Sequence, residues 1–265
     1  GDQFFPLVMT PCGRQVRLRR ADLQLVPPGS GGPLPKAASQ VLVLVDPGHG
    51  GVQDGAIGVD GSREADRVLA LGTEVSRLLA ARVGRVYLTR TRDVTETLKF
   101  RVALGDALRA DVAVSVHLNA DPDGRLDRPG VETYGSVADP QGRRLAGVMY
   151  EAERRFLQTV PGPWQGDTDA GAKFRIGRAG GDYYGLLRRA HLPWVISESL
   201  FMTSAHDMRL LDQASVQRGL ATAIADGARD FATSRVSGSG WTKPYPRLPN
   251  PAPAGSERPC VDPVR

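Results

Sequence analysis

Short apolar runs and longer segments of helical periodicity alternate through the middle of the chain. The runs VLVLV (41–45) and VAVSV (112–116) are rich in β-branched residues and leucine, which is typical of strands buried on both faces of a sheet. The segments RVYLTR (85–90) and VETYGS (131–136) alternate in polarity, and VETYGS predicts an edge strand. A further strand is predicted at WVISE (194–198).

Helical patterns separate these strands. Within 64–82, four apolar residues recur at intervals of three and four, as on one face of a helix: Val68, Leu71, Val75 and Leu79. Comparable patterns predict helices over 97–109, 139–157 and 182–190, and one or two helices within 205–232. This alternation indicates an α/β fold, with a largely parallel twisted sheet flanked by helices on both faces.

The two ends of the chain lack this pattern. Residues 1–40 are expected to form an irregular extension with short strand-like pieces, and they end in the linker-like stretch PPGSGGPLPK (27–36). Residues 235–265 form a Pro/Gly-rich tail without apolar periodicity. The sequence therefore predicts one domain over 41–234 with an extension at each end.

Composition sets limits on the class of protein. A chain of 265 residues with 41% hydrophobic content is long enough for one sizeable core. The net charge of +5 comes mostly from arginine and favours an anionic partner, although scattered arginines also follow from genomic base composition. Aromatic residues are few and do not alternate with basic ones, so nucleic-acid binding is not expected.

Membrane and export signals are also missing from the printed sequence. No apolar run reaches the roughly 18 residues that a membrane-spanning helix needs. The first residues, GDQFFPLVMT, lack the basic start and apolar stretch of a secretory signal. Either the protein is cytoplasmic, or a signal was removed before the numbering begins.

Chemically capable side chains lie where the predicted strands end. His49 follows the first strand in DPGHGG (46–51), His117 follows 112–116, and Glu198 closes 194–198. Glu64 begins the first predicted helix. Because ligands bind at the carboxyl edge of open α/β sheets, we expect these four side chains to converge there.

Two histidines and one glutamate are a recurring ligand set for catalytic zinc, in which a fourth position stays open. We therefore predict that His49, Glu64 and His117 bind Zn²⁺. Glu198 is then placed to act as general base, taking a proton from the attacking water and returning it to the leaving amine. Neighbouring glycines would let the backbone turn sharply beside the metal.

Each of these residues also has an ordinary interpretation when taken alone. A histidine before glycines is usually a turn residue, and a glutamate at a helix start usually interacts with the helix dipole. A glutamate in an apolar strand end, such as Glu198, is less ordinary because its burial is costly unless it is paired. Their joint occurrence on one edge favours a functional site. His191 and His206 are expected to be structural.

Other chemistries fit less well. The glycine pattern at 46–55 has neither GxGxxG spacing nor a Walker lysine, and no serine lies in a GxSxG motif. Cys12 and Cys260 have no nucleophile or metal-site context. In an exported protein they would be candidates for a disulfide that ties the two ends together, and the alternative is two unrelated thiols.

Residues 41–234 resemble the zinc-dependent N-acetylmuramoyl-L-alanine amidases of the type 3 catalytic domain family. The resemblance runs through ordered blocks: VLVLVDPGHGGVQDGAIG, READRVLALG, RVYLTRTRDVTETLKFRVALGDALRADVAVSVHLNA and LPWVISESLFMTSAHDMRLL. In this chain, Leu200 stands where the family usually has glycine, and Ser204 where it usually has asparagine.

The resemblance implies that His49, Glu64 and His117 bind zinc and that Glu198 is catalytic. It implies hydrolysis of the amide between the lactyl group of N-acetylmuramic acid and L-alanine of the stem peptide, in cell-wall remodelling or daughter-cell separation. The substrate, peptidoglycan, implies a periplasmic or cell-wall location. We also expect a monomer. The site is expected to be open, because the stretch between the strand 131–136 and Glu198 is too short for a long helix that would block it. An activating partner protein is possible but has no signal in the sequence.

Asn119, Arg175 and Arg178 are weaker candidates for contacting the substrate, and surface or turn roles are their alternatives. Two rival functions stay open. One is a metallopeptidase that cuts elsewhere in the stem peptide, and the other is a non-catalytic peptidoglycan-binding or regulatory module, which the complete set of four site residues disfavours.

Overall fold

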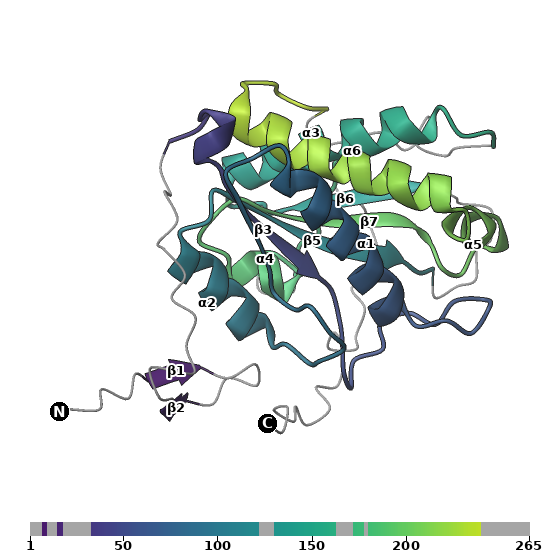
Figure 1. Cartoon of the computed structure of the whole chain (residues 1–265), viewed down its shortest axis with the longest axis horizontal. Coiled ribbons are helices and arrows are strands. Elements are labelled where there is room, and N and C mark those ends of the chain that lie inside the picture. The colour runs from purple at the N-terminus through teal and green to yellow at the C-terminus, as the bar shows by residue number, and fades with distance from the viewer. Residues whose placement is uncertain are drawn as a thin grey trace.

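Five strands form the central sheet of the computed structural model, in the order β4-β3-β5-β7-β6 (Figure 1). Four strands run parallel, and β6 pairs antiparallel with β7 at one edge, as predicted for 131–136. The structure describes residues 7–9, 15–17, 33–121, 130–162, 172–177 and 180–239. The strand bounds are β3 Leu42–Pro47, β4 Arg85–Leu88, β5 Val112–Asn119, β6 Val131–Gly135 and β7 Trp194–Phe201.

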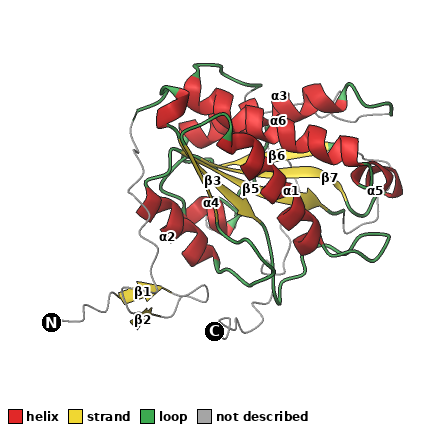
Figure 2. Cartoon of the chain, viewed as in Figure 1, coloured by secondary structure: helices red, strands yellow, loops and turns green. Residues whose placement is uncertain are grey.

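Helices cover both faces of this sheet (Figure 2). The helix bounds are α1 Glu64–Ala80, α2 Leu98–Leu108, α3 Pro140–Leu157, α4 Gly185–Arg189, α5 Ala205–Leu211 and α6 Ala214–Thr233. One face packs against α1, α3 and α6, and the other against α2 and α4. The predicted fold class is therefore confirmed. The described N-terminal residues add two antiparallel strands, β1 Leu7–Met9 and β2 Gln15–Arg17, and the short 3-10 helix Ala38–Gln40.

Alternation along the strands explains why the sheet has two cores. In β3, Val43 and Val45 face the core beneath α1, α3 and α6, whereas Leu42 and Leu44 face the smaller core beneath α2 and α4. All four side chains are fully buried. Successive side chains of a strand point to opposite faces, so an uninterrupted apolar run was required at this central position.

Two strands extend further than the apolar runs predict. β5 continues through His117 to Asn119, and β7 continues past Glu198 to Phe201. Parallel pairing holds these polar ends in the sheet, with a register shift between His117 and Asn119. At these ends polar side chains such as His117 and Glu198 are interspersed with buried apolar ones, Leu118 and Leu200, that belong to the larger core. No helix in the described part of the chain is long and apolar enough to span a membrane.

A buried carboxyl group ties α3 to the back of β7. Glu153 is fully buried and accepts hydrogen bonds from Ser197 Oγ (2.6 Å) and Ser199 Oγ (2.5 Å). Burial raises the pKa of Glu153 from its ordinary value of 4.5 to about 7, although the two serine hydroxyls partly oppose the shift. The protein therefore holds this carboxyl group in its protonated form at mildly acidic pH.

Glu153 is expected to make the protein less stable as the pH rises. A folded-state pKa above the unfolded value gives stability that is complete below about pH 4.5 and is lost as the pH rises through about 7. Relative to the wild type, Glu153→Gln should gain on the order of 3 kcal/mol of unfolding free energy between these limits. Urea unfolding of both proteins from pH 4.5 to 8 measures the difference, and a pH-independent difference would contradict the assignment.

Candidate metal centre

His49, Glu64 and His117 meet at the carboxyl edge of the sheet. The Nε2 atom of His49 lies 3.1 Å from one Glu64 carboxylate oxygen, and the Nδ1 atom of His117 lies 3.0 Å from the other. The two ring nitrogens are 3.1 Å apart, and one donor atom from each residue lies within 4.8 Å of the others. In the described ranges this is the one group of three or more potential ligands. The structure thus brings together the three predicted zinc ligands.

The loop after β3 places His49 in an uncommon backbone conformation. His49 itself adopts a left-handed φ of 57°, and Gly50 and Gly51 continue with φ of 116° and 60°. At Gly48 the reason for glycine is contact with the second ligand, because a Cβ atom there would lie 2.2 Å from Cε1 of His117. The glycines around His49 therefore permit both the turn and the approach of the two imidazole rings.

The carboxylate of Glu64 is fixed by the backbone as well as by the histidines. The amide of Ala56 donates to Oε2 (2.8 Å), and the amide of Leu118 donates to Oε1 (3.0 Å). Burial alone would raise the pKa of Glu64, but its hydrogen bonds to His117 and His49 outweigh burial and hold the pKa below the ordinary value. Glu64 is therefore an anionic donor.

The imidazole of His117 is suited to bind a cation. Burial lowers its pKa, and the nearby His49 ring lowers it further, although Glu64 opposes both effects. A neutral imidazole keeps a nitrogen lone pair for a metal ion. The side chains of His49 and His117 keep 28% and 18% of their exposure, so both rings are partly accessible to solvent.

A buried ion pair supports the loop from the α2 side. Arg101 on α2 donates to the Asp46 carboxylate, to the carbonyl oxygen of Pro47 (2.9 Å) and to that of His49 (2.8 Å). Asp46 also accepts from Thr89 Oγ1 and Ser115 Oγ, each at 2.6 Å. Burial would raise the pKa of Asp46, but Arg101 and the two hydroxyl groups hold it below the ordinary value. The pair is ionised and links the backbone of His49 to α2.

Glu198 lies beside the metal cluster through strand register. It pairs with His117 across β5 and β7, and with Glu132 across β7 and β6. Residues paired in register point to the same face of a sheet, so His117, Glu198 and Glu132 form a row across three neighbouring strands. Glu198 is partly exposed, whereas Glu132 is buried. The structure therefore places the predicted general base next to a predicted ligand.

Glu132 and Lys173 were not predicted from the sequence. Glu132 accepts from Lys173 Nζ (2.7 Å), Asn119 Nδ2 (2.7 Å) and the Tyr134 hydroxyl (2.6 Å). Burial would raise the pKa of Glu132, but the charge of Lys173 outweighs it and lowers the pKa. In the sequence, the one indication of this buried network was the acidic residue within the strand pattern VETYG. The network ties the edge strand to the end of β5 that carries His117.

Lys173→Met should destabilise the protein by about 3 kcal/mol or more, because it leaves the Glu132 carboxylate buried without its cation. The double variant with Glu132→Gln should regain much of this loss, since it removes both charges. Denaturant unfolding of the two single variants and the double variant gives the coupling energy. Additive effects would show that the two side chains do not depend on each other.

The two departures from the family pattern have local explanations. Leu200 is buried at a left-handed φ of 74°, a conformation that favours glycine, and its amide donates to the carbonyl oxygen of Gly130 (3.0 Å). Ser204 is the N-cap of α5 and accepts from the Asp207 amide. Asparagine and serine are both favoured N-caps, so the second departure preserves the helix start.

The weaker site predictions are not brought to the cluster. Asn119 is buried, and its amide is engaged by Glu132 and by the amide of Ala120. The segment that contains Lys173 runs parallel to β6, because Lys173 pairs in parallel with Tyr134. Since β6 is antiparallel to β7, this segment leads away from the carboxyl edge, where Glu198 lies, and Arg175 follows on it. There the guanidinium carbon of Arg175 lies 3.6 Å from the centre of the Tyr183 ring. Contacts of Asn119 and Arg175 with substrate stay predictions.

Several other predictions concern residues outside the described ranges or histidines outside the metal cluster. Arg178, Cys12 and Cys260 lie outside the described residues. His191 is exposed and lies 2.8 Å from an Asp106 oxygen, and His206 lies 3.0 Å from Asp207. Neither histidine belongs to the metal cluster.

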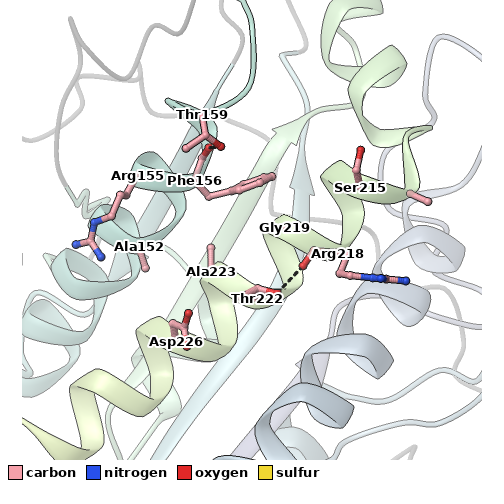
Figure 3. A pocket seen from close by; sticks show the side chains of 11 residues that line it. Ala152, Arg155, Phe156, Thr159, Ser215, Arg218, Gly219, Thr222, Ala223 and Asp226 are labelled. Carbon is pink, nitrogen blue, oxygen red and sulfur yellow. Dashed lines mark hydrogen bonds between the residues drawn. The ribbon is translucent and has the colours of Figure 1, made fainter.

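A groove of about 730 Å³ lies between α3 and α6 (Figure 3). The Phe156 ring approaches Gly219 in it so closely that a Cβ atom there would lie 2.0 Å from the ring. None of the four predicted catalytic and metal-binding residues lines this groove. The four candidate residues therefore lie at the carboxyl edge of the sheet and not in this hollow.

Three donors lie at the carboxyl edge of a mostly parallel sheet, one on the loop after β3, one at the start of α1 and one on β5. They define an α/β protein with a candidate catalytic metal centre. Residues 43–230 match the sequence model of the N-acetylmuramoyl-L-alanine amidase family, and the chain belongs to that family.

Named relatives agree with this membership. N-acetylmuramoyl-L-alanine amidase AmiC of Escherichia coli is 27% identical over 238 residues, which cover 78% of this chain and 57% of that relative. The chain thus spans little more than half of that protein. Among solved structures, amidase AmiC2 of Nostoc punctiforme has a TM-score of 0.60 and 31% identity, covering 72% of this chain and 96% of that one. The catalytic domain of CwlV from Bacillus (Paenibacillus) polymyxa has a TM-score of 0.62 and 26% identity, covering 74% and 99%.

Proposed function

We propose that this chain is a zinc-dependent N-acetylmuramoyl-L-alanine amidase. It would hydrolyse the amide between the lactyl group of N-acetylmuramic acid and L-alanine of the peptidoglycan stem peptide. The observation that carries the proposal is the convergence of His49, Glu64 and His117, with Glu198 in register beside His117. Family membership supplies the substrate class.

The donor set fits zinc. Two imidazole nitrogens and one carboxylate lie within 4.8 Å of one another, and the set suits a tetrahedral ion with its fourth position free. When bound, zinc would supply Lewis-acid polarisation of the scissile carbonyl and would make an attacking water more acidic. The partial exposure of both histidines leaves room for an extended substrate to approach.

The protein's own side chains would transfer the proton and hold the ligands in place. Glu198 would take the proton of the attacking water and deliver it to the leaving amine of L-alanine. Glu64 stays anionic and is held by two backbone amides, which keeps the ligand geometry fixed while the substrate binds and leaves. Asp46 and Arg101 hold the backbone of His49. Lys173 neutralises Glu132 next to the general base.

The remaining proposals follow from this substrate. The protein would act outside the cytoplasm, in the periplasm or cell wall, in wall remodelling or daughter-cell separation. We propose a monomer, and the sequence carries no signal for an activating partner. The domain limits, 41–234 with extensions 1–40 and 235–265, and a bridge between Cys12 and Cys260 stay predictions.

Chelation is expected to abolish peptidoglycan hydrolysis, and added zinc should restore it. The purified protein is incubated with isolated peptidoglycan before and after dialysis against a chelator, and the soluble products are identified by mass spectrometry. The expected products are free stem peptides that begin with L-alanine and glycan strands with a free lactyl carboxylate. Fragments cut within the stem peptide would favour a metallopeptidase, and absence of products at every zinc concentration would favour a non-catalytic binding module.

A further inference from the structure

Arg90 follows β4 and is buried beneath the metal centre, where only 2% of its surface is exposed. Its guanidinium group donates to the carbonyl oxygen of Pro47 (2.9 Å) and, through Nη2, to that of Gly48 (2.7 Å). The same Nη2 atom donates to the carbonyl oxygen of Ala65 (2.7 Å), and Nη1 donates to that of Arg92 (3.2 Å). Four backbone carbonyl groups thus converge on one side chain.

These carbonyl groups belong to the immediate neighbours of two candidate ligands. Gly48 precedes His49, and Ala65 follows Glu64. Farther along, the loop after β3 is joined to the first turn of α1 by its backbone, because the amides of Glu64 and Ala65 donate to the carbonyl oxygens of Ala56 (2.9 Å) and Asp54 (3.0 Å). The part of the loop next to His49 is joined to α1 through a side chain. Arg90 supplies this connection with two hydrogen bonds from a single nitrogen atom.

The burial of Arg90 has no explanation in an ion pair. In the parts of the chain that the structure describes, no carboxylate oxygen lies within 4.0 Å of its guanidinium group. Burial lowers its pKa to about 10, and the neighbouring Arg101 contributes to the decrease, although the charges of Asp46, Asp93 and Asp66 oppose it. Burying a cation whose hydrogen bonds all go to carbonyl groups is costly, and the guanidinium group joins the backbone on both sides of the metal centre.

We infer that Arg90 is a positioning residue that fixes the backbone of His49 relative to that of Glu64, so that the metal centre is assembled before the metal binds. The planar guanidinium group presents several donors in a fixed fork, which suits carbonyl groups that belong to three separate segments: the end of β3 with its loop, the start of α1 and the loop after β4. A lysine would offer a point charge on a flexible stem and could not hold all of them at once. Arg101 differs, because it pairs with Asp46 and its hydrogen bonds to Pro47 and His49 join the loop to α2 and not to α1.

This inference rests on the proposed zinc site and predicts an effect on zinc affinity apart from catalysis. Arg90→Lys and Arg90→Met should weaken zinc binding by about 10-fold or more, the usual range for groups that support ligands from outside the first shell. The affinity is measured on folded apoprotein by competition with a chromophoric chelator. Circular dichroism and thermal unfolding report the fold of each variant.

Two control variants separate positioning from stability. Leu79→Ala removes a fully buried side chain at the far end of α1 and should destabilise the protein while leaving its zinc affinity unchanged. Arg77→Gln removes an exposed arginine paired with Glu74 and should change neither property. Zinc affinity at the wild-type level in folded Arg90 variants, or a loss no larger than in Leu79→Ala, would overturn the inference.

Two further outcomes are also decisive. If neither Arg90 variant folds, amide hydrogen exchange of the wild type is compared with and without zinc. A prearranged centre predicts that residues 48–50 and 64–66 are already protected in the apoprotein, and ordering of both segments only after zinc is added would refute the inference. A wild-type protein that binds no zinc would refute the proposed function as well, so failure of the two ideas can be told apart.

Discussion

Glu198→Gln is expected to reduce the rate of amide hydrolysis by about 10²- to 10⁴-fold, the range for loss of a general acid–base group. The amide side chain keeps the size of the carboxylate but cannot accept the proton of the attacking water. Zinc content should not change, because Glu198 is not among the three clustered donors. Release of soluble products from peptidoglycan measures the rate, and elemental analysis measures the metal.

A matched control for this variant is Glu151→Gln, a change of the same chemistry on α3, the helix that packs on the opposite face of the sheet from Glu198. Its activity should equal that of the wild type. The assignment of Glu198 fails if Glu198→Gln hydrolyses peptidoglycan nearly as fast as the wild type. It also fails if the variant loses zinc, since the side chain would then act as a ligand and not as a base.

Gly48→Ala should disrupt the metal centre although it adds a single methyl group. The new Cβ atom would lie 2.2 Å from Cε1 and 2.4 Å from Nε2 of His117, far inside van der Waals contact. The imidazole ring must move away, and its donor atom moves with it. We expect zinc affinity to fall by about 100-fold or more, at the upper end of effects seen for groups around a metal site.

Gly181→Ala is the corresponding control, because a Cβ atom there would meet nothing within 4 Å. Titration of both apoproteins with zinc against a competing chelator gives the two affinities, and circular dichroism tests whether each protein is folded. Wild-type zinc affinity in a folded Gly48→Ala protein would show that the His117 ring does not bind the metal in the observed orientation.

Much of the architecture could be predicted from the sequence because its strands and helices carry different periodicities. The buried run at 41–45 and the helical spacing over 64–82 each indicate one element, and their alternation leaves few topologies. The rule that ligands gather at the carboxyl ends of parallel strands then brought His49, His117 and Glu198 to one edge. Boundaries were less certain where polar residues continue a strand, as at Asn119.

The groups that support the site could not be predicted, because their contacts join distant parts of the chain. Arg90 reads as an ordinary polar residue after a strand, and only the packing of β3 and α1 around it shows which carbonyl groups it meets. Lys173 reaches Glu132 through a segment that adds to the edge of β6. The direction of that segment also carries Arg175 away from the carboxyl edge, and spacing along the sequence contains no information about direction.

The points at which the chain enters and leaves the α/β domain lie close together. The Lys36 amide donates to the carbonyl oxygen of Ala232 (2.9 Å), and the Lys36 ammonium group pairs with Asp111, which immediately precedes β5. Both points therefore lie at the amino ends of the parallel strands, and the metal cluster lies at the carboxyl ends. An affinity tag, fluorophore or immobilising tether attached to a domain trimmed at these two points would start from the side remote from the metal cluster.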